Sequence, residues 1–206
     1  AVLSAQVAFG LGFGGCGPIN AAIAQFLAVT WPNVRRFMAF DLSRARADVF
    51  GEALLAYRPG ATFTVAANIE DLLGECPMVA FATTAIEPYV DNLDACQAGA
   101  TLLHVSLRDL SAGAILSSHN IVDDLDHVNR AATSIQLASD RAGNTDFVHG
   151  SLGDILLGNV PLPLRDERRM IFSPFGLGVL DLAVADLVQK EIAKDGGGTR
   201  VESFLP

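Results

Sequence analysis

Stretches typical of buried strands alternate with stretches typical of helices along this chain of 206 residues. A strand is expected over residues 7–13, a helix over residues 19–29 follows it, and the last helix is expected over residues 177–193. Further strands are expected over residues 35–41, 61–66, 78–83, 101–107, 120–124 and 170–176. Strands separated by helices form parallel βαβ units with right-handed crossovers. The sequence therefore predicts an α/β fold with a doubly wound, mostly parallel sheet and helices on both faces.

Composition narrows the possible functions. Hydrophobic residues make up 50% of the chain and charged residues 18%, which is enough for a large core. A net charge of −9 argues against nucleic acid and anionic membrane surfaces as partners, and no apolar run approaches the roughly 20 residues of a spanning helix. The three cysteines have no metal-binding spacing, so we expect no metal and reduced thiols in the cytoplasm.

The segment GGCGPIN, residues 14–20, joins the first strand to the first helix. Gly15 and Gly17 supply the G-x-G part of a dinucleotide fingerprint, in which glycines permit a tight turn and close approach of a pyrophosphate. Pro18 falls in the first helical turn, where its missing N–H costs nothing. The next N–H groups, from Ile19 onward, would face the phosphates. Asn20 occupies the third fingerprint position, and we expect its amide to donate to a phosphate or ribose.

Asp41 ends the second strand, roughly 20 residues after the glycine loop. In dinucleotide-binding folds a carboxylate at this spacing accepts hydrogen bonds from the ribose hydroxyls. It favours NAD over NADP, because it would repel a 2′-phosphate. A 2′-phosphate could instead be served by Ser43, Arg44 and Arg46. Alternatively, the two arginines stack on adenine or lie in a solvated first helical turn. Together with the glycine loop, Asp41 predicts a Rossmann dinucleotide-binding site.

Polar side chains follow the later strands, and the doubly wound fold brings all these strand ends to one edge beside the ligand. Thr83 and Thr84 would contact the cofactor. The other candidates are His104, Ser106, Arg108 and Asp109 after the fifth strand, Asp123, Asp124, Asp126 and His127 after the sixth, and Ser173, Pro174 and Gly176 after the last. Alternatively, Arg108 and Asp109 pair with each other, and Asp124 or Asp126 caps the following helix.

These residues resemble the ornithine cyclodeaminase/mu-crystallin family, in particular its N-(2-amino-2-carboxyethyl)-L-glutamate dehydrogenase branch. The resemblance covers nearly the whole chain. It rests on the segments GCGPIN, FATTA, LHVSLRDL, NIVDDLDHVNRAATS, GNTDFVHGSLGDILLG, SPFGLGVLDLAVADLV and the final FLP.

The resemblance implies that residues 1–185 are an NAD-binding Rossmann domain. Residues 186–206 would be the end of a helix and an arm that pack on an N-terminal domain with no counterpart in this sequence. That domain would bind the amino-acid substrate and form a homodimer. The implied reaction is NAD-dependent cleavage of the C–N bond of N-(2-amino-2-carboxyethyl)-L-glutamate, which yields L-2,3-diaminopropionate for siderophore or antibiotic biosynthesis.

The resemblance also implies roles for single residues. The pyrophosphate loop corresponds to residues 15 and 17–20, the ribose acid to Asp41, and the nicotinamide loops to Thr83, Thr84 and the Ser173–Gly176 turn. Asp109 would be the acid–base, with Arg108 beside it to tune its pKa and contact the substrate carboxylate, and Asp123 as the next candidate. The alternatives are a cyclodeaminase, an amino-acid dehydrogenase, a ketimine reductase or a non-catalytic, mu-crystallin-like binding protein.

Overall fold

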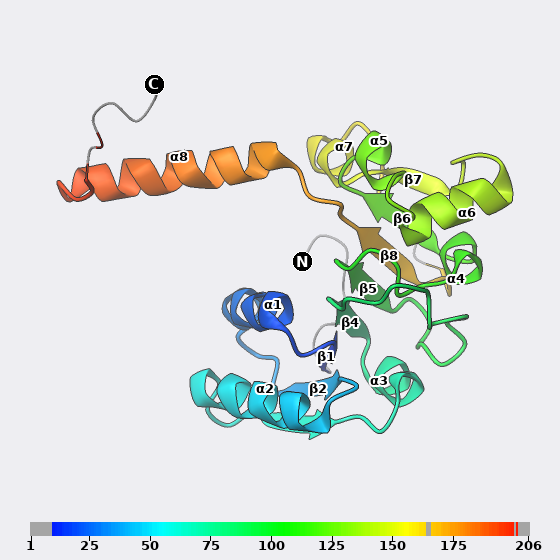
Figure 1. The fold of residues 1–206 in the computed structure, drawn as a ribbon, viewed down its shortest axis with the longest axis horizontal. Coiled ribbons are helices and arrows are strands. Elements are labelled where there is room, and N and C mark those ends of the chain that lie inside the picture. Colours follow the sequence, from blue (N-terminus) through cyan, green and yellow to red (C-terminus); the bar gives the residue numbers. More distant parts are fainter. Residues whose placement is uncertain (1–9, 164–165, 200, 202–206) are drawn as a thin grey trace. The chain divides into compact units, whose positions relative to one another are not determined.

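The computed structural model describes residues 10–163, 166–199 and 201. It holds one sheet in the order β3-β2-β1-β4-β5-β8-β6-β7, and every pair of neighbouring strands is parallel (Figure 1). The strands are β1 (Leu11–Gly14), β2 (Arg36–Phe40), β3 (Thr62–Val65), β4 (Met78–Phe81), β5 (Thr101–His104), β6 (His119–Val122), β7 (Val148–Ser151) and β8 (Met170–Ser173). The predicted doubly wound, Rossmann-type sheet is confirmed.

The described helices connect these strands. They are α1 (Pro18–Thr30), α2 (Arg44–Tyr57), α3 (Ile69–Glu75), α4 (Ala112–Leu116), α5 (Leu125–Val128), α6 (Ser134–Ala142), α7 (Leu152–Leu157) and α8 (Gly178–Lys194). The sequence missed β7, because this strand lies at the edge of the sheet and is only partly buried, so it lacks the apolar run of a central strand. None of the helices in the described ranges combines the length and apolar character that crossing a bilayer requires.

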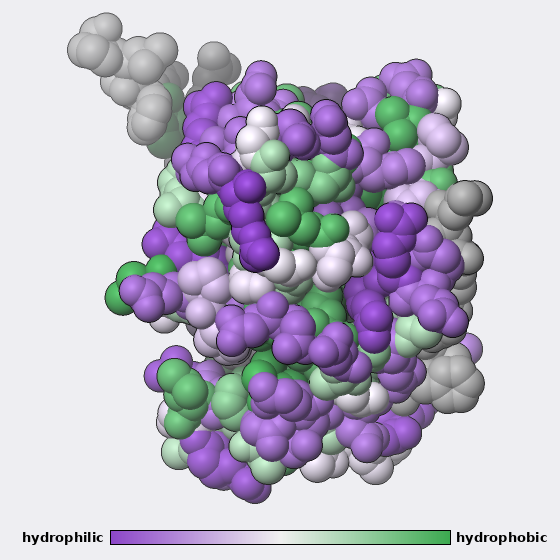
Figure 2. Space-filling view, turned by 90° about the vertical axis from the view of Figure 1, so that its right-hand side faces the viewer, coloured by the Kyte–Doolittle hydropathy of each residue, from purple (hydrophilic) through white to green (hydrophobic). Residues whose placement is uncertain are grey.

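The core lies on both faces of the sheet because successive strand residues point to opposite sides. In β4, Met78 and Ala80 pack with the apolar sides of α1 and α2, whereas Val79 and Phe81 pack with α3, α4 and α6. The outer surface on the α3, α4 and α6 side, to the right in Figure 1, is mostly hydrophilic with small hydrophobic patches (Figure 2). The helices therefore bury both faces of the sheet and leave the carboxyl ends of its strands to carry the loops.

The chain divides into two compact units, one ending at Phe175 and the other beginning at Gly176. The second unit contains α8, and none of the side chains of this helix is buried. Its exposed large hydrophobic residues are Val179, Leu180, Leu182, Val184, Leu187, Val188 and Ile192. Most of the predicted C-terminal arm, residues 202–206, lies outside the described residues.

Candidate functional site

The glycine loop begins where β1 ends. Gly15 has φ +88°, and a Cβ at this position would lie 2.7 Å from the carbonyl oxygen of Ala82, so glycine is required. Gly17 is the N-cap of α1, and a Cβ there would meet no protein atom within 4 Å. Pro18 is the first residue of this 13-residue helix, as predicted, and no side chain caps the helix. The loop thus leaves a helix N-terminus open to an anion.

Asn20 lies beneath this loop and not in it. Its side chain is fully buried, and its Nδ2 donates to the carbonyl oxygens of Gly14 (3.0 Å), Gly15 (2.7 Å) and Ala80 (3.3 Å). The amide therefore ties the glycine loop to the ends of β1 and β4. The predicted donation from this amide to a phosphate or ribose is wrong, because backbone carbonyls already occupy the amide.

Asp41 follows β2 directly and holds two loops. Its Oδ2 accepts from the Cys16 N–H at 2.9 Å, and its Oδ1 accepts from the Ser43 N–H at 2.8 Å. The Arg46 Nε lies 3.9 Å from Oδ1. Each carboxylate oxygen keeps a second lone pair, and the side chain is 9% exposed. Burial and the negative charge of Asp41 raise the pKa of the Cys16 thiol to about 12, so this cysteine stays protonated.

Four other predicted cofactor residues lie at the surface. Ile19, in the first turn of α1, is 55% exposed, and the side chain of Thr84 is exposed in the loop after β4. Arg44 forms an exposed ion pair with Asp48 at 2.9 Å along α2. Gly176, with φ +103°, opens the second unit. Their predicted contacts with a cofactor stay predictions.

Asp109 is buried and is the centre of a hydrogen-bond network. Thr83 Oγ1 and Tyr89 OH donate to its Oδ1, the latter at 3.0 Å, and Ser106 Oγ donates to its Oδ2. His104 Nε2 lies 3.3 Å from Oδ2. Burial raises the pKa of Asp109, but hydrogen bonds from His104, Ser106 and Thr83 outweigh it, so the pKa lies below its usual value. Burial and the Asp109 charge raise the pKa of Tyr89. The carboxylate is therefore ionised and hydrogen-bonded on both oxygens.

Arg108 does not accompany Asp109. Its Nη1 donates to the Ile86 carbonyl at 3.2 Å, and its Nη2 donates to the Ala131 carbonyl at 2.9 Å. Among the described residues, the ion pair that Asp109 forms is with His104. The predicted pairing of Arg108 with Asp109, and the predicted tuning of Asp109 by Arg108, are wrong. The guanidinium instead joins the loop after β4 to the turn before α6.

Asp123 follows β6 and binds the loop that follows β8. Its two carboxylate oxygens each accept from the Phe175 N–H at 3.0 Å, and its Oδ1 also accepts from the Asp124 N–H at 2.8 Å. Asp124 is the N-cap of α5, as one of the sequence alternatives predicted, and it accepts from the His127 N–H. Over residues 10–163, 166–199 and 201, no group of three His, Cys, Asp or Glu side chains is arranged to hold a metal ion.

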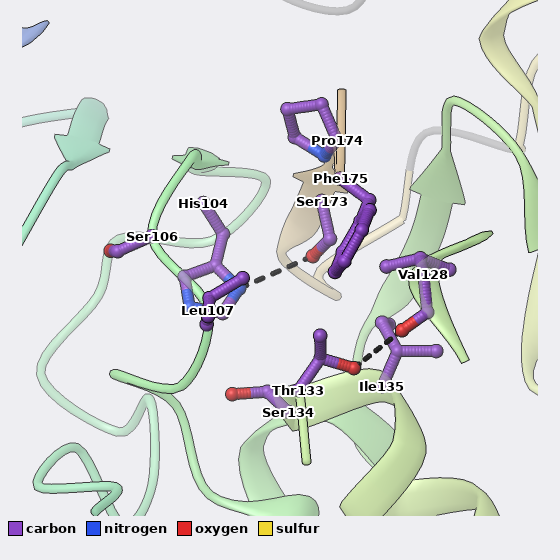
Figure 3. A pocket seen from close by; sticks show the side chains of 10 residues that line it. All are labelled: His104, Ser106, Leu107, Val128, Thr133, Ser134, Ile135, Ser173, Pro174 and Phe175. Carbon is purple, nitrogen blue, oxygen red and sulfur yellow. Dashed lines mark hydrogen bonds between the residues drawn. The ribbon is translucent and has the colours of Figure 1, made fainter. Parts of the chain in front are cut away.

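A small pocket lies where β5, β8 and the start of α6 meet, and its volume of about 10 Å³ is room for about one water molecule. It is lined by His104, Ser106, Leu107, Val128, Thr133, Ser134, Ile135, Ser173, Pro174 and Phe175. Figure 3 shows the His104 ring turned toward Ser173, and the distance from Nδ1 to Ser173 Oγ is 3.3 Å. Asp109 does not line the pocket and reaches it only through its partners.

The predicted site residues thus fall into two connected groups. Gly15, Gly17 and Asp41 form the loops at the ends of β1 and β2, whereas Thr83, Ser106 and Asp109 form the network at the ends of β4 and β5. The bonds of Asn20 to both β1 and β4 join the two groups. Tyr89 was missed, and His104 was noted only among the polar strand ends. A histidine at the end of an otherwise apolar strand was the available signal.

No protein-family model matches the chain. The chain is similar to N-((2S)-2-amino-2-carboxyethyl)-L-glutamate dehydrogenase of Staphylococcus aureus, with 22% identity over 92% of the chain. Its fold matches Δ1-pyrroline-2-carboxylate reductase of Thermococcus litoralis in complex with NADH and L-proline, with a TM-score of 0.86, 20% identity and 96% of the chain covered. It also matches a probable ornithine cyclodeaminase from Bordetella pertussis, with a TM-score of 0.79, 22% identity and 96% covered.

The resemblance to the ornithine cyclodeaminase family is confirmed. The chain spans 57% of the length of the Staphylococcus relative, 62% of the Thermococcus chain and 64% of the Bordetella chain. These three proteins therefore contain a large part that this sequence does not match.

Proposed function

We propose that this chain is the NAD-binding part of an oxidoreductase that acts on a C–N bond of an amino acid. The open N-terminus of α1 behind Gly15 and Gly17, with Asp41 beside it, carries this proposal. Support comes from the Staphylococcus relative, which is named a dehydrogenase, and from the Thermococcus structure, which holds NADH and L-proline.

The loop offers open space at Gly17 and an acid beside it, as a dinucleotide site requires. The open space over Gly17 leaves room for a pyrophosphate beside the uncapped N–H groups of α1. The second lone pairs of the Asp41 carboxylate would accept from ribose hydroxyls, and its charge would repel a 2′-phosphate. The exposed side chain of Leu42, which follows Asp41, offers an apolar surface for adenine. Bound NAD would supply a hydride acceptor, and the residues of this chain would hold and orient it.

The finer proposal names the substrate. N-(2-amino-2-carboxyethyl)-L-glutamate and NAD⁺ would react with water to give L-2,3-diaminopropionate, 2-oxoglutarate, NADH and a proton. Its support is the Staphylococcus relative together with the segments quoted above. A second candidate is reduction of a cyclic imine, the activity named for the Thermococcus structure. Assays of the whole protein with each substrate separate these two reactions.

We also propose that the apolar side chains of α8 pack on a further domain, which corresponds to the part of the similar proteins that this sequence does not match. A 17-residue helix with no buried side chain and seven exposed large hydrophobic residues is typical of an element that needs a partner. That part would hold the substrate and form the homodimer, with residues 186–206 among its contacts. The isolated chain would accordingly bind NAD without oxidising the substrate.

The test is to fill the space over Gly17. We expect Gly17→Val to keep the melting temperature within a few degrees, because its φ of −89° is ordinary and its Cβ meets nothing. NAD binding measured by calorimetry should become undetectable. Gly153→Val, in α7 after the edge strand β7, is the matched control, since its Cβ makes only an ordinary contact with Ser151 Oγ at 3.7 Å. Unchanged NAD binding by the valine variant would overturn the proposal.

A further inference from the structure

Three side chains at the ends of β5 and β8 form a continuous line from the pocket to the buried carboxylate. Ser173 Oγ lies 3.3 Å from His104 Nδ1, and His104 Nε2 lies 3.3 Å from Asp109 Oδ2. Their exposed fractions are 3%, 1% and 0%, so all three side chains are buried. The parallel register of β5 and β8, in which Leu103 pairs with Phe172, places the next residues, His104 and Ser173, side by side.

The His104 ring has a partner at each nitrogen in both neutral forms, and the Asp109 N–H bonds to the ring only when Nε2 carries no proton. With the proton on Nδ1, the ring donates to Ser173, and Nε2 accepts from the Asp109 N–H at 3.2 Å. With the proton on Nε2, the ring donates to the Asp109 carboxylate, and Ser173 donates to Nδ1. A ring protonated on both nitrogens also has two acceptors, one of them a carboxylate. The ring is therefore placed to gain and lose a proton without moving.

We propose that His104 exchanges protons with a group bound in the pocket through Ser173, and that Asp109 is a positioning residue for the ring. This inference rests on the proposed function. An amine or water molecule in the pocket would give its proton to Ser173 Oγ while Ser173 passes its own proton to Nδ1. The ring would then be an imidazolium, and Asp109 would stay a carboxylate. In the reverse direction the same line would return the proton.

The surroundings favour His104 over Asp109 as the proton carrier. His104 and Ser173 line the pocket, and Asp109 does not. The charged and titratable groups facing the ring in the described chain are Asp109 and, behind it, Tyr89, while the Phe81 ring meets its edge at a centroid distance of 6.4 Å. Thr83 and Ser106 also donate to Asp109, and the resulting low pKa opposes protonation of the carboxylate.

The test combines nitrogen NMR of the His104 ring in this chain with kinetics of the full-length protein. In Asp109→Asn the nitrogen spectrum of the ring should change, and the acid limb of the rate–pH profile should shift. His104→Gln should lower the rate by about 10²–10⁴-fold, and Ser173→Ala should lower it at least about tenfold. Both variants should keep an NAD affinity within about twofold of the wild type. His119→Gln, at a buried histidine that begins β6 and pairs with Asp166, should change neither.

An acid limb that stays in place in Asp109→Asn would overturn the proposal, as would a His104→Gln rate within a few-fold of the wild type. Failure of the proposed function would give a different result from failure of this inference. In that case the wild-type chain would not bind NAD at all, while the ring titration would still report whether Asp109 and His104 are coupled.

Discussion

At the ends of β1 and β2 the backbone itself faces the candidate ligand site, whereas at the ends of β4, β5 and β8 side chains bond to one another. In the first region, the N-terminus of α1 after Gly17 has no side-chain cap, and Asn20 and Asp41 hold the loops from behind. In the second region, the Asp109 carboxylate gathers donors from three loop positions and a strand end. A dinucleotide needs an open, preformed cradle, while proton chemistry needs polarised side chains in a dry place.

The largest effect on stability should come from removing the Asp109 carboxylate from the second region. Asp109→Ala leaves the hydroxyls of Thr83, Ser106 and Tyr89 without their acceptor in a partly buried site, and removes the partner of the buried His104. We expect the free energy of unfolding to fall by about 3–5 kcal/mol. Urea denaturation measures this loss, with the exposed Asp140→Ala as the control. A loss no larger than that of the control would mean that the network does not hold the loops together.

A smaller effect is expected in the first region, at Asn20. Asn20→Ala removes an amide that serves three buried carbonyl groups, so the free energy of unfolding should fall by about 1–3 kcal/mol. The exposed Asn144→Ala is the matched control. If the variant kept its stability and lost only NAD affinity, Asn20 would be a ligand contact and the distinction between the regions would disappear.

Low pH should distinguish the two regions further, because it protonates the Asp109 carboxylate of the second region. The pKa of Asp109 is lowered in the folded chain, so its contribution to stability is complete above the usual aspartate pKa of about 4. This contribution is lost as the pH falls through the lower, folded value. The urea midpoint of the wild type should therefore drop below pH 4, and Asp109→Asn should drop less. If the urea midpoints of the wild type and of Asp109→Asn fell in parallel with pH, Asp109 would not be the group responsible for the loss of stability in acid.

The sequence predicted the first region better than the second for a physical reason. Gly15, Gly17, Pro18 and Asp41 act through local backbone geometry at a fixed spacing after two strands, which a sequence displays directly. The contact of Asn20 with Ala80 spans 60 residues, so no local pattern announces it.

The second region depends on the directions of side chains, which neighbouring positions in a sequence do not reveal. Arg108 and Asp109 are neighbours in the sequence, but one side chain reaches the loops before α6 and after β4 while the other turns into the core. His104 meets Ser173 only because β8 enters the sheet beside β5, an order that the alternation of strands and helices does not fix.

The most direct test of the nucleotide site is a calorimetric titration of this chain with NAD and with NADP. We expect NAD to bind at least about tenfold more tightly, because the Asp41 carboxylate would lie against a 2′-phosphate. Asp41→Ala should narrow that preference, mainly by weakening NAD. Equal or tighter binding of NADP by the wild-type chain, or no binding of either cofactor, would contradict the account.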